Sequence, residues 1–177
     1  MGKWGYGPFD NDGAADFAGD LDATPLPRRI YAIRAALASV AGDGSPHIDG
    51  GKAELAIAAA ALTVRGVEGG DEFQSATWGP RGEIPQIPKE LTLLALKAIS
   101  RLLSTSNDLQ DDWSVEEEGA EWLAMLRRLQ ALLDRESAAG IPFSAPGPEG
   151  HGQGKGQGQQ GSKRATNEDA SVQEGLW

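Results

Sequence analysis

The chain of 177 residues contains no cysteine and only two histidines, His47 and His151. Without a thiol it cannot form a disulfide, supply a cysteine nucleophile or build a cysteine-based zinc site. Two histidines are too few to complete a zinc site convincingly in the absence of cysteine. We therefore expect no metal and no other cofactor in this protein.

Long apolar runs and signal segments are also lacking. No apolar stretch approaches the roughly 20 residues that a membrane-spanning helix needs, and no apolar signal core follows the opening Met-Gly-Lys-Trp-Gly. The sequence contains no Gly-x-Ser-x-Gly elbow, P-loop or dinucleotide-binding fingerprint. With the absence of cysteine, these features predict a cytoplasmic protein that does not enter a membrane.

Basic residues are outnumbered, 16 against 26 acidic ones, which gives a net charge of -10 and a pI near 4.6. A chain this acidic repels phosphate backbones and anionic lipid surfaces, so we expect it to bind neither nucleic acid nor membranes. Basic proteins and cationic ligands are the partners that this charge favours.

Residues 145–177 have little with which to form a core. Gly alternates there with Gln, Lys and His before a polar stretch, and almost no apolar side chains offset the entropy of ordering. We predict a disordered tail over residues 145–177 and a folded domain over residues 1–144. The domain carries 13 of the 16 basic residues and 22 of the 26 acidic ones, so the acidity belongs to it.

Apolar residues recur at spacings of three and four, the period of an α-helix, in most of the remaining chain. The spacing predicts helices over residues 12–21, 25–41 and 52–65, another that begins after Pro88 and runs to about Ser104, and a last one from Ser114. No segment alternates with a period of two for long enough to indicate a strand. The predicted fold is an all-α bundle of about four main helices plus a short N-terminal helix.

Residues with cap chemistry mark where these helices begin. Asp12 can accept hydrogen bonds from the first amides of the N-terminal helix, and Thr24 can cap the next helix with Pro25 in its first position. Ser114 and Glu117 have the spacing of a capping box. The buried stripe predicted for the last helix comprises Val115, Trp122, Met125, Leu126, Leu129, Leu132 and Leu133.

The segment from Leu55 to Leu62 is apolar on nearly all sides and rich in alanine. We expect it to be the buried central helix, because small side chains let neighbouring helices approach closely. A long Gly- and Pro-rich connection follows over residues 66–88 and includes Trp78. Connections of this length are often functional or mobile.

The most specific string in the chain is Trp4-Gly5-Tyr6-Gly7-Pro8-Phe9-Asp10-Asn11-Asp12. Its glycines permit backbone conformations that a side chain would forbid, and its proline fixes one torsion. We expect the three aromatic residues to insert into the bundle as anchors. The Asp-Asn-Asp sequence then leads into the first helix as caps and turn formers.

This string resembles the opening signature of a bacterial family, domain-of-unknown-function family 4259. Members open with Gly-x-Trp-Gly-x-Gly-Pro-Phe followed by an acid, Asn and Asp, which corresponds to residues 2–12 here. The patches at residues 88–91, 106–113 and 121–123 are similar to further family motifs. The resemblance covers about residues 1–133 and departs from the family at Asp112, where Leu is usual, and in residues 66–88. It implies a bacterial origin and a small helical domain, but no activity.

Acidic residues near the N-terminus raise the question of a metal site. Asp10, Asn11, Asp12 and Asp16 offer oxygen ligands, but a calcium loop beginning at Asp10 would lack the ligand and the glycine required at its fifth and sixth positions. Helix capping explains these residues better. A looser divalent site formed by Asp10, Asp12 and Asp16 stays open as an alternative.

One histidine lies in a polar loop that could carry chemistry. His47 has Asp43 and Asp49 as sequence neighbours, a combination that could bind a metal or act as an acid or base. A single loop histidine beside acids is more often simply solvated, so no catalytic role is assigned to it.

A run of acidic residues between Asp108 and Glu121 precedes and begins the last predicted helix. Such charges are favourable at a helix N-terminus, and they could also form a docking surface for a basic protein. We therefore predict a non-enzymatic binding or regulatory protein that uses an acidic helical surface, together with the connection containing Trp78.

Two alternatives remain open at this stage: a metal-dependent enzyme that uses the N-terminal acids, and a homodimeric structural module. No catalytic, cofactor-binding or metal-binding residue is assigned. The candidate functional residues are Trp4, Phe9, Asp10, Asn11, Asp12, Asp16, Trp78 and Trp113.

Overall fold

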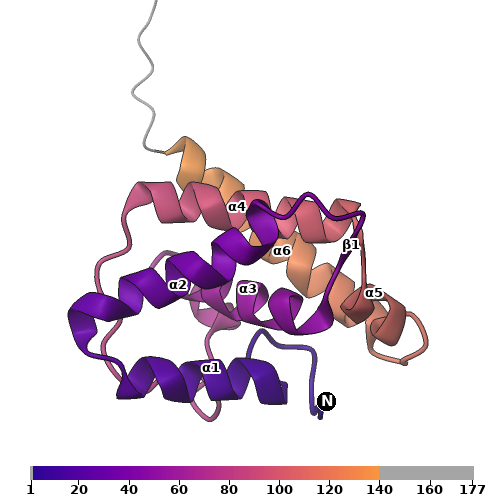
Figure 1. Ribbon diagram of the computed structural model, residues 1–177, viewed down its shortest axis with the longest axis horizontal. Coiled ribbons are helices and arrows are strands. Elements are labelled where there is room, and N and C mark those ends of the chain that lie inside the picture. Colours follow the sequence, from indigo (N-terminus) through magenta and orange to yellow (C-terminus); the bar gives the residue numbers. More distant parts are fainter. Residues whose placement is uncertain (1, 140–177) are drawn as a thin grey trace, which may run out of the picture. The chain divides into compact units, whose positions relative to one another are not determined.

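The computed structural model describes residues 2–139, and the predicted tail lies outside these residues. The described part contains six α-helices, one short 3-10 helix and one two-stranded sheet, which confirms the all-α prediction (Figure 1). In chain order the elements are α1 (Asp12–Ala23), α2 (Leu26–Ala41), β1 (His47–Ile48), α3 (Gly50–Thr63), η1 (Asp71–Phe73), α4 (Lys89–Ser104), β2 (Ser106–Asn107), α5 (Asp108–Trp113) and α6 (Gly119–Ala138).

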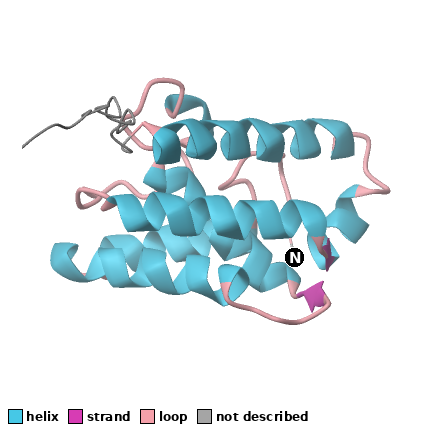
Figure 2. Cartoon of the chain, turned by 90° about the horizontal axis from the view of Figure 1, so that it is seen from above, coloured by secondary structure: helices cyan, strands magenta, loops and turns pink. Residues whose placement is uncertain are grey.

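Helix α3 is the centre of the bundle, as its composition predicts. It contacts α1, α2, α4 and α5, and α6 packs against α4 (Figures 1 and 2). Every residue from Ala56 to Thr63 is buried. Alanine side chains keep this helix thin, so that neighbours on several sides can approach its backbone.

The two strands were not predicted from the sequence, and the expectation of no strand is wrong in this detail. β1 and β2 pair in parallel, with His47 opposite Ser106 and Ile48 opposite Asn107. Strands of two residues are too short to show alternation, so no periodicity could reveal them. Each strand leads directly into a helix. Asp49, the residue after β1, caps α3, and Asn107, the last residue of β2, caps α5.

Two predicted helix caps are replaced by neighbouring residues. Asn11, not Asp12, caps α1: its Oδ1 accepts a hydrogen bond from the amide of Ala14 at 2.8 Å. Thr24 ends α1 instead of starting α2, since its hydroxyl donates to the carbonyl of Asp20 at 2.7 Å. Helix α2 starts at Leu26, after Pro25, with no side-chain cap.

The last predicted helix corresponds to α6, which begins at Gly119 and not at Ser114, and the short helix α5 before it was not predicted. Ser114 ends α5 and its hydroxyl donates to the carbonyl of Asp111 at 2.7 Å, so the predicted capping box with Glu117 does not form. Val115 lies in the turn between the helices and is 83% exposed, which corrects its placement in the buried stripe. The other six residues predicted for that stripe are buried, as expected.

Helices α2 and α4 end where the sequence predicts, and α3 begins two residues earlier, at Gly50. The long connection before α4, residues 66–88, is attached to the bundle by a buried side chain and a hydrogen bond. Phe73 of η1 is 1% exposed, and the side-chain amide of Gln74 donates to the carbonyl of Ala61 at 2.8 Å. Among residues 2–139, no helix is both long and apolar enough to cross a bilayer.

Candidate functional site

The N-terminal segment, residues 2–11, is fastened to the start of α1 by backbone and carboxylate hydrogen bonds. The amide of Trp4 donates to the carbonyl of Asp10 at 3.1 Å, and the amide of Gly2 donates to Oδ2 of Asp12 at 2.8 Å. Oδ2 of Asp10 accepts from the amide of Gly7 at 3.0 Å. A Cβ on Gly7 would lie 2.6 Å from that oxygen, so a larger residue here would force the Asp10 carboxylate to move.

The three aromatic residues of the segment differ in burial. Phe9 is 1% exposed and belongs to the core, as predicted, whereas Trp4 and Tyr6 are 44% and 42% exposed. The ring of Trp4 packs against that of Trp78, with centroids 4.8 Å apart. The prediction that all three insert is therefore wrong for Trp4 and Tyr6, and two of the candidate residues meet at the surface instead.

Lys3 provides the clearest chemical signal in this region. Its ammonium lies 4.6 Å from the centroid of the Trp113 ring, 3.7 Å from Oδ2 of Asp112 and 4.0 Å from Oε1 of Glu116. Trp113 is itself stacked on Trp122, with centroids 6.0 Å apart. An aromatic face between carboxylates is the surrounding that a cationic head group prefers.

A cavity of about 460 Å³ opens beside this lysine, and we call it the Trp113 hollow. Its lining comprises Lys3, Trp4, Gly5, Trp113, Glu116 and Glu118. The hollow therefore joins the N-terminal segment to α5 and to the turn before α6. It contains Trp4 and Trp113 of the predicted candidates, while Trp78 supports it through Trp4.

Glu54 of α3 is a functional candidate that sequence reasoning missed. It is 1% exposed, and its Oε2 has no hydrogen-bond partner within residues 2–139. Burial raises the pKa of this carboxyl, the carboxylates of Asp12 and Asp112 add to the increase, and Lys3 opposes it. A lone acid in an otherwise apolar stretch was the available signal.

A second, smaller cavity adjoins this carboxylate, and we call it the Glu54 cavity. Its volume is about 10 Å³, and its lining includes Lys3, Gly5, Asp10, Asn11, Glu54 and Trp113. It shares Lys3, Gly5 and Trp113 with the Trp113 hollow, so the two spaces are neighbours.

The acids considered for a divalent site have other roles. Asp10 and Asp12 each accept a backbone amide of the N-terminal segment, and Asp16 is exposed on α1. Asn11 uses its oxygen to cap α1. Within the described range 2–139, no three Asp, Glu, His or Cys side chains are placed to hold a metal ion.

His47 contacts residues other than its sequence neighbours. Its Nδ1 lies 3.0 Å from Oγ of Ser106, and its Nε2 lies 2.7 Å from Oδ1 of Asp108. Ser–His–Asp hydrolases use the opposite ring orientation, with Nε2 at the serine. Asp108 also accepts the amide of Gly50 at 2.8 Å, so the trio links β1, β2 and the start of α3 as a structural connection.

Asp43 and Asp49 do not join that trio. Hydrogen bonds from Ser45, together with the Lys52 ammonium, hold the pKa of Asp43 well below its usual range. Lys52 lies 3.1 Å from Oδ2 of Asp43, and Asp49 accepts the amide of Lys52 as the cap of α3.

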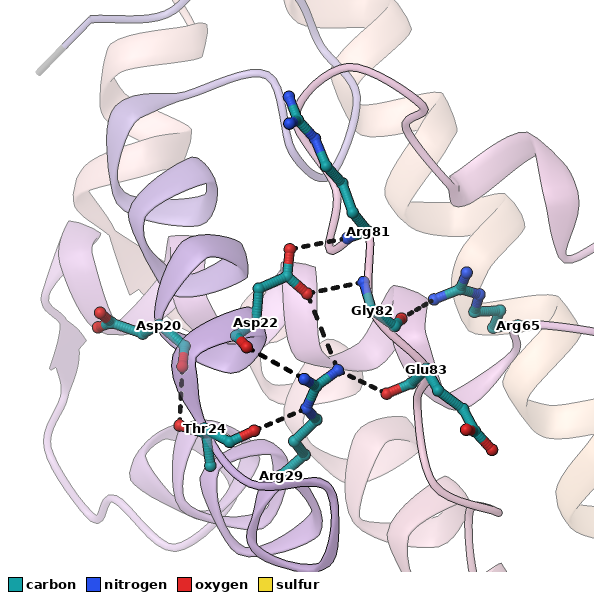
Figure 3. Close-up of polar contacts among 8 residues, drawn as sticks. All are labelled: Asp20, Asp22, Thr24, Arg29, Arg65, Arg81, Gly82 and Glu83. Atoms are coloured by element: carbon teal, nitrogen blue, oxygen red, sulfur yellow. Dashed lines mark hydrogen bonds and ion pairs between the residues drawn. The ribbon is translucent and has the colours of Figure 1, made fainter.

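A buried arginine fixes the connection that carries Trp78. Arg29 of α2 donates to the carbonyls of Thr24, Asp22 and Glu83 at 2.9, 3.1 and 2.7 Å (Figure 3). The carboxylate of Asp22 accepts from the amides of Arg81 and Gly82 at 2.9 and 2.8 Å. The chain just after Trp78 is thereby fastened to the end of α1 and the start of α2.

The network around Arg29 favours the ionised form of the Asp22 carboxyl over its protonated form. Burial acts to raise the pKa of Asp22, but the amides of Arg81 and Gly82 and the guanidinium of Arg29 outweigh it. Its pKa therefore lies below the usual value.

Another cavity, of about 630 Å³, lies between the end of α3, residues 83–87 and α4. Its ionic lining is mixed, with Arg65, Lys89, Glu83 and Glu136, so it favours no single class of ligand.

Comparison with known protein families identifies the family of this chain. A family model described as "Domain of unknown function (DUF4259)" matches residues 2–125, a range that includes the Trp113 hollow and Glu54. Searches among curated proteins and among solved structures returned no match. The chain belongs to the DUF4259 family.

Proposed function

We propose that this protein is a non-enzymatic binding module that recognises a basic segment of another protein at the Trp113 hollow. The observation that carries the proposal is the position of Lys3, whose ammonium lies over the Trp113 ring between Asp112 and Glu116. This surrounding suits a lysine or arginine side chain from a partner for the same physical reasons.

The size and the rim of the hollow support the proposal. A volume of about 460 Å³ is sufficient for one or two long side chains. Trp4 and Trp78 expose aromatic surface beside it, and exposed tryptophan is common at the centre of protein interfaces. The net charge of -10 steers a basic partner toward the molecule before contact.

The enzymatic alternative has weaker support. A metal-dependent enzyme built on Asp10 and Asp12 would need these carboxylates to be available, yet each accepts a backbone amide that fastens the N-terminal segment. Binding of a cation at the Trp113 hollow, by contrast, uses Trp113, Asp112 and Glu116, which already surround the ammonium of Lys3.

A pair of charge variants tests the proposal. Glu116→Gln with Glu118→Gln removes two charges from the hollow, whereas Glu117→Gln with Glu121→Gln removes two exposed charges outside its lining. The probe is a ten-residue peptide of alternating Gly and Lys, with tryptophan fluorescence and calorimetry as readouts. We expect the first pair to weaken binding about tenfold, or about 1.4 kcal/mol, and the second pair to have a much smaller effect.

Ionic strength provides a second check on the same peptide. Raising the salt concentration from about 0.05 M to about 0.3 M should weaken binding strongly, because it shortens the Debye length over which exposed charges act. Equal losses in the two double variants, or binding that ignores salt, would show that the hollow does not recognise cations.

The homodimer alternative has one observation in its favour. An apolar groove of about 610 Å³ lies between α1, α2 and α3, lined by Phe17, Ala32, Ala35 and Leu55 among others. A second copy could bury this surface. Light scattering over a concentration series tests this alternative, and a mass that stays monomeric would exclude it.

A further inference from the structure

We infer that the Trp113 hollow recognises the trimethylammonium head group of a methylated lysine side chain in preference to the unmodified ammonium. The inference rests on the proposed function, because it names the form of the basic side chain that the hollow takes from a partner protein.

Two indole rings line the hollow, and a second tryptophan supports each of them. Trp4 and Trp113 belong to the lining. Trp78 packs against Trp4 with 50° between the ring planes, and Trp122 stacks on Trp113 with 15° between them. Rings held in this way need little reordering when a ligand enters. Indole is the best aromatic partner for a cation, and aromatic rings around one head group are the arrangement that binds quaternary ammonium ions.

The distances around the ammonium of Lys3 show how the hollow holds a cation. Nζ lies 4.6 Å from the centroid of the Trp113 ring, 3.7 Å from Oδ2 of Asp112 and 4.0 Å from Oε1 of Glu116. Both carboxylate distances are longer than a hydrogen bond. This ammonium is therefore held by charge and by the aromatic ring, without a hydrogen bond to either acid.

Lys52 shows the other way in which this protein holds an ammonium. Its Nζ donates a hydrogen bond to Oδ2 of Asp43 at 3.1 Å. A primary ammonium has three N–H donors, and a position without acceptors at that distance leaves donors unused. A trimethylammonium group has no N–H to satisfy, and its methyl groups fill the space between the nitrogen and the surrounding oxygens and ring. The spacing around Lys3 therefore suits a methylated nitrogen better than an unmodified one.

A ligand in this position must displace Lys3, because two cations repel each other over one ring face. The side chain of Lys3 is 19% exposed and has a flexible four-carbon stem, so it can turn out into solvent. The hollow, with a volume of about 460 Å³, then has room for the enlarged head group. Glu116 and Glu118 of the lining balance its positive charge.

Three ten-residue peptides test the inference by calorimetry. In each, glycine alternates with one other residue: lysine, trimethyl-lysine, or the neutral isostere of trimethyl-lysine in which carbon replaces the charged nitrogen. The first two peptides carry the same charge, so long-range attraction acts equally on both. Wild-type protein should bind the trimethyl-lysine peptide about tenfold more tightly than the lysine peptide, and should bind the neutral peptide more weakly than either.

Three variants locate the preference. Trp4→Leu removes an exposed indole of the hollow, and Tyr31→Leu is the matched control, because Tyr31 of α2 is 68% exposed and lies outside the lining. The ratio of the affinities for the trimethyl-lysine and lysine peptides should fall to about two in Trp4→Leu and stay at about ten in Tyr31→Leu. In Lys3→Met both charged peptides should bind several-fold more tightly, because the internal competitor is gone.

The outcomes separate this inference from the proposed function. If neither charged peptide binds wild-type protein, the proposed function fails. A neutral peptide that binds as tightly as the trimethyl-lysine peptide would overturn both proposals, because charge would then contribute nothing.

Equal affinities for the two charged peptides, or a preference that survives in Trp4→Leu, overturn the inference while binding at the hollow stands. Circular dichroism checks that Trp4→Leu folds. Should it not fold, Lys3→Met decides, since an affinity for the trimethyl-lysine peptide that does not rise in that variant also overturns the inference.

Discussion

Arg29 has a role that its sequence neighbour does not share. Arg28 is exposed, whereas the guanidinium of Arg29 is buried and donates to three backbone carbonyls from two separate segments. The two residues stand side by side in the sequence, and no local pattern distinguishes them. Only the return of residues 81–83 to the end of α1 and the start of α2 gives Arg29 its structural role.

Replacement of each arginine by lysine tests this difference. In Arg29→Lys the charge is kept but the forked geometry is lost, so carbonyls of the network lose their donors. We expect the free energy of unfolding to fall by about 2 kcal/mol. Urea denaturation measures the change, and Arg28→Lys is the matched control, with an expected change within about 0.5 kcal/mol. Equal effects would mean that the network contributes nothing specific.

Glu54 yields a prediction about pH. Its folded-state pKa is raised above the usual 4.5, so its stabilising contribution is complete below that value and is lost as pH rises through the higher folded-state pKa. Glu54→Gln cannot ionise and should be more stable than wild type at pH 7 in the absence of a ligand. The difference should shrink as the pH falls toward 4.5.

Denaturation of both proteins between pH 4 and pH 8 measures this difference. A Glu54→Gln protein that is less stable than wild type at pH 7 would contradict the prediction, and would indicate that the carboxylate is paired in solution.

At the scale of elements, the N-terminal segment combines two different uses of aromatic residues. Phe9 is buried in the core, while Trp4 lies at the surface against Trp78. Phe9→Ala should lower the free energy of unfolding by about 3–5 kcal/mol, the usual cost of a cavity in a core. Trp4→Ala should cost only about 1 kcal/mol, the worth of one aromatic pair. Thermal and urea denaturation provide the comparison, and equal costs would contradict it.

Helices with long apolar stripes could be predicted well from the sequence. Helices α2 and α4 repeat apolar residues through four turns, and their ends agree with the prediction. The helix caps were harder to predict. Asn11 and Asp12 are both good capping residues, and which of them caps α1 depends on a contact between Asp12 and Gly2. The turn between α5 and α6 was missed because Ser114 and Glu117 have capping-box spacing in a segment that turns instead.

At the scale of the whole molecule, the candidate site could be predicted only in part. Trp4 and Trp113 were recognised from the motifs in which they stand, and both line the hollow. Lys3 and Glu54 were missed, since their importance depends on contacts across more than 40 residues of sequence. Lys3 meets Asp112, and Glu54 borders a cavity closed by the N-terminal segment. Neither relation leaves a periodic signal.

The short sheet has a consequence for how the molecule folds. Joining His47 of β1 to Ser106 of β2 closes a loop with a sequence separation of 59. Such a closure is entropically costly, and it is favourable only after the intervening helices have packed. The strands lead into α3 and α5, the helices that carry Glu54 and Trp113. The Trp113 hollow joins Lys3 to Asp112 across a still longer stretch of sequence, so it is also assembled late in folding, and binding of a peptide there would report the completion of folding.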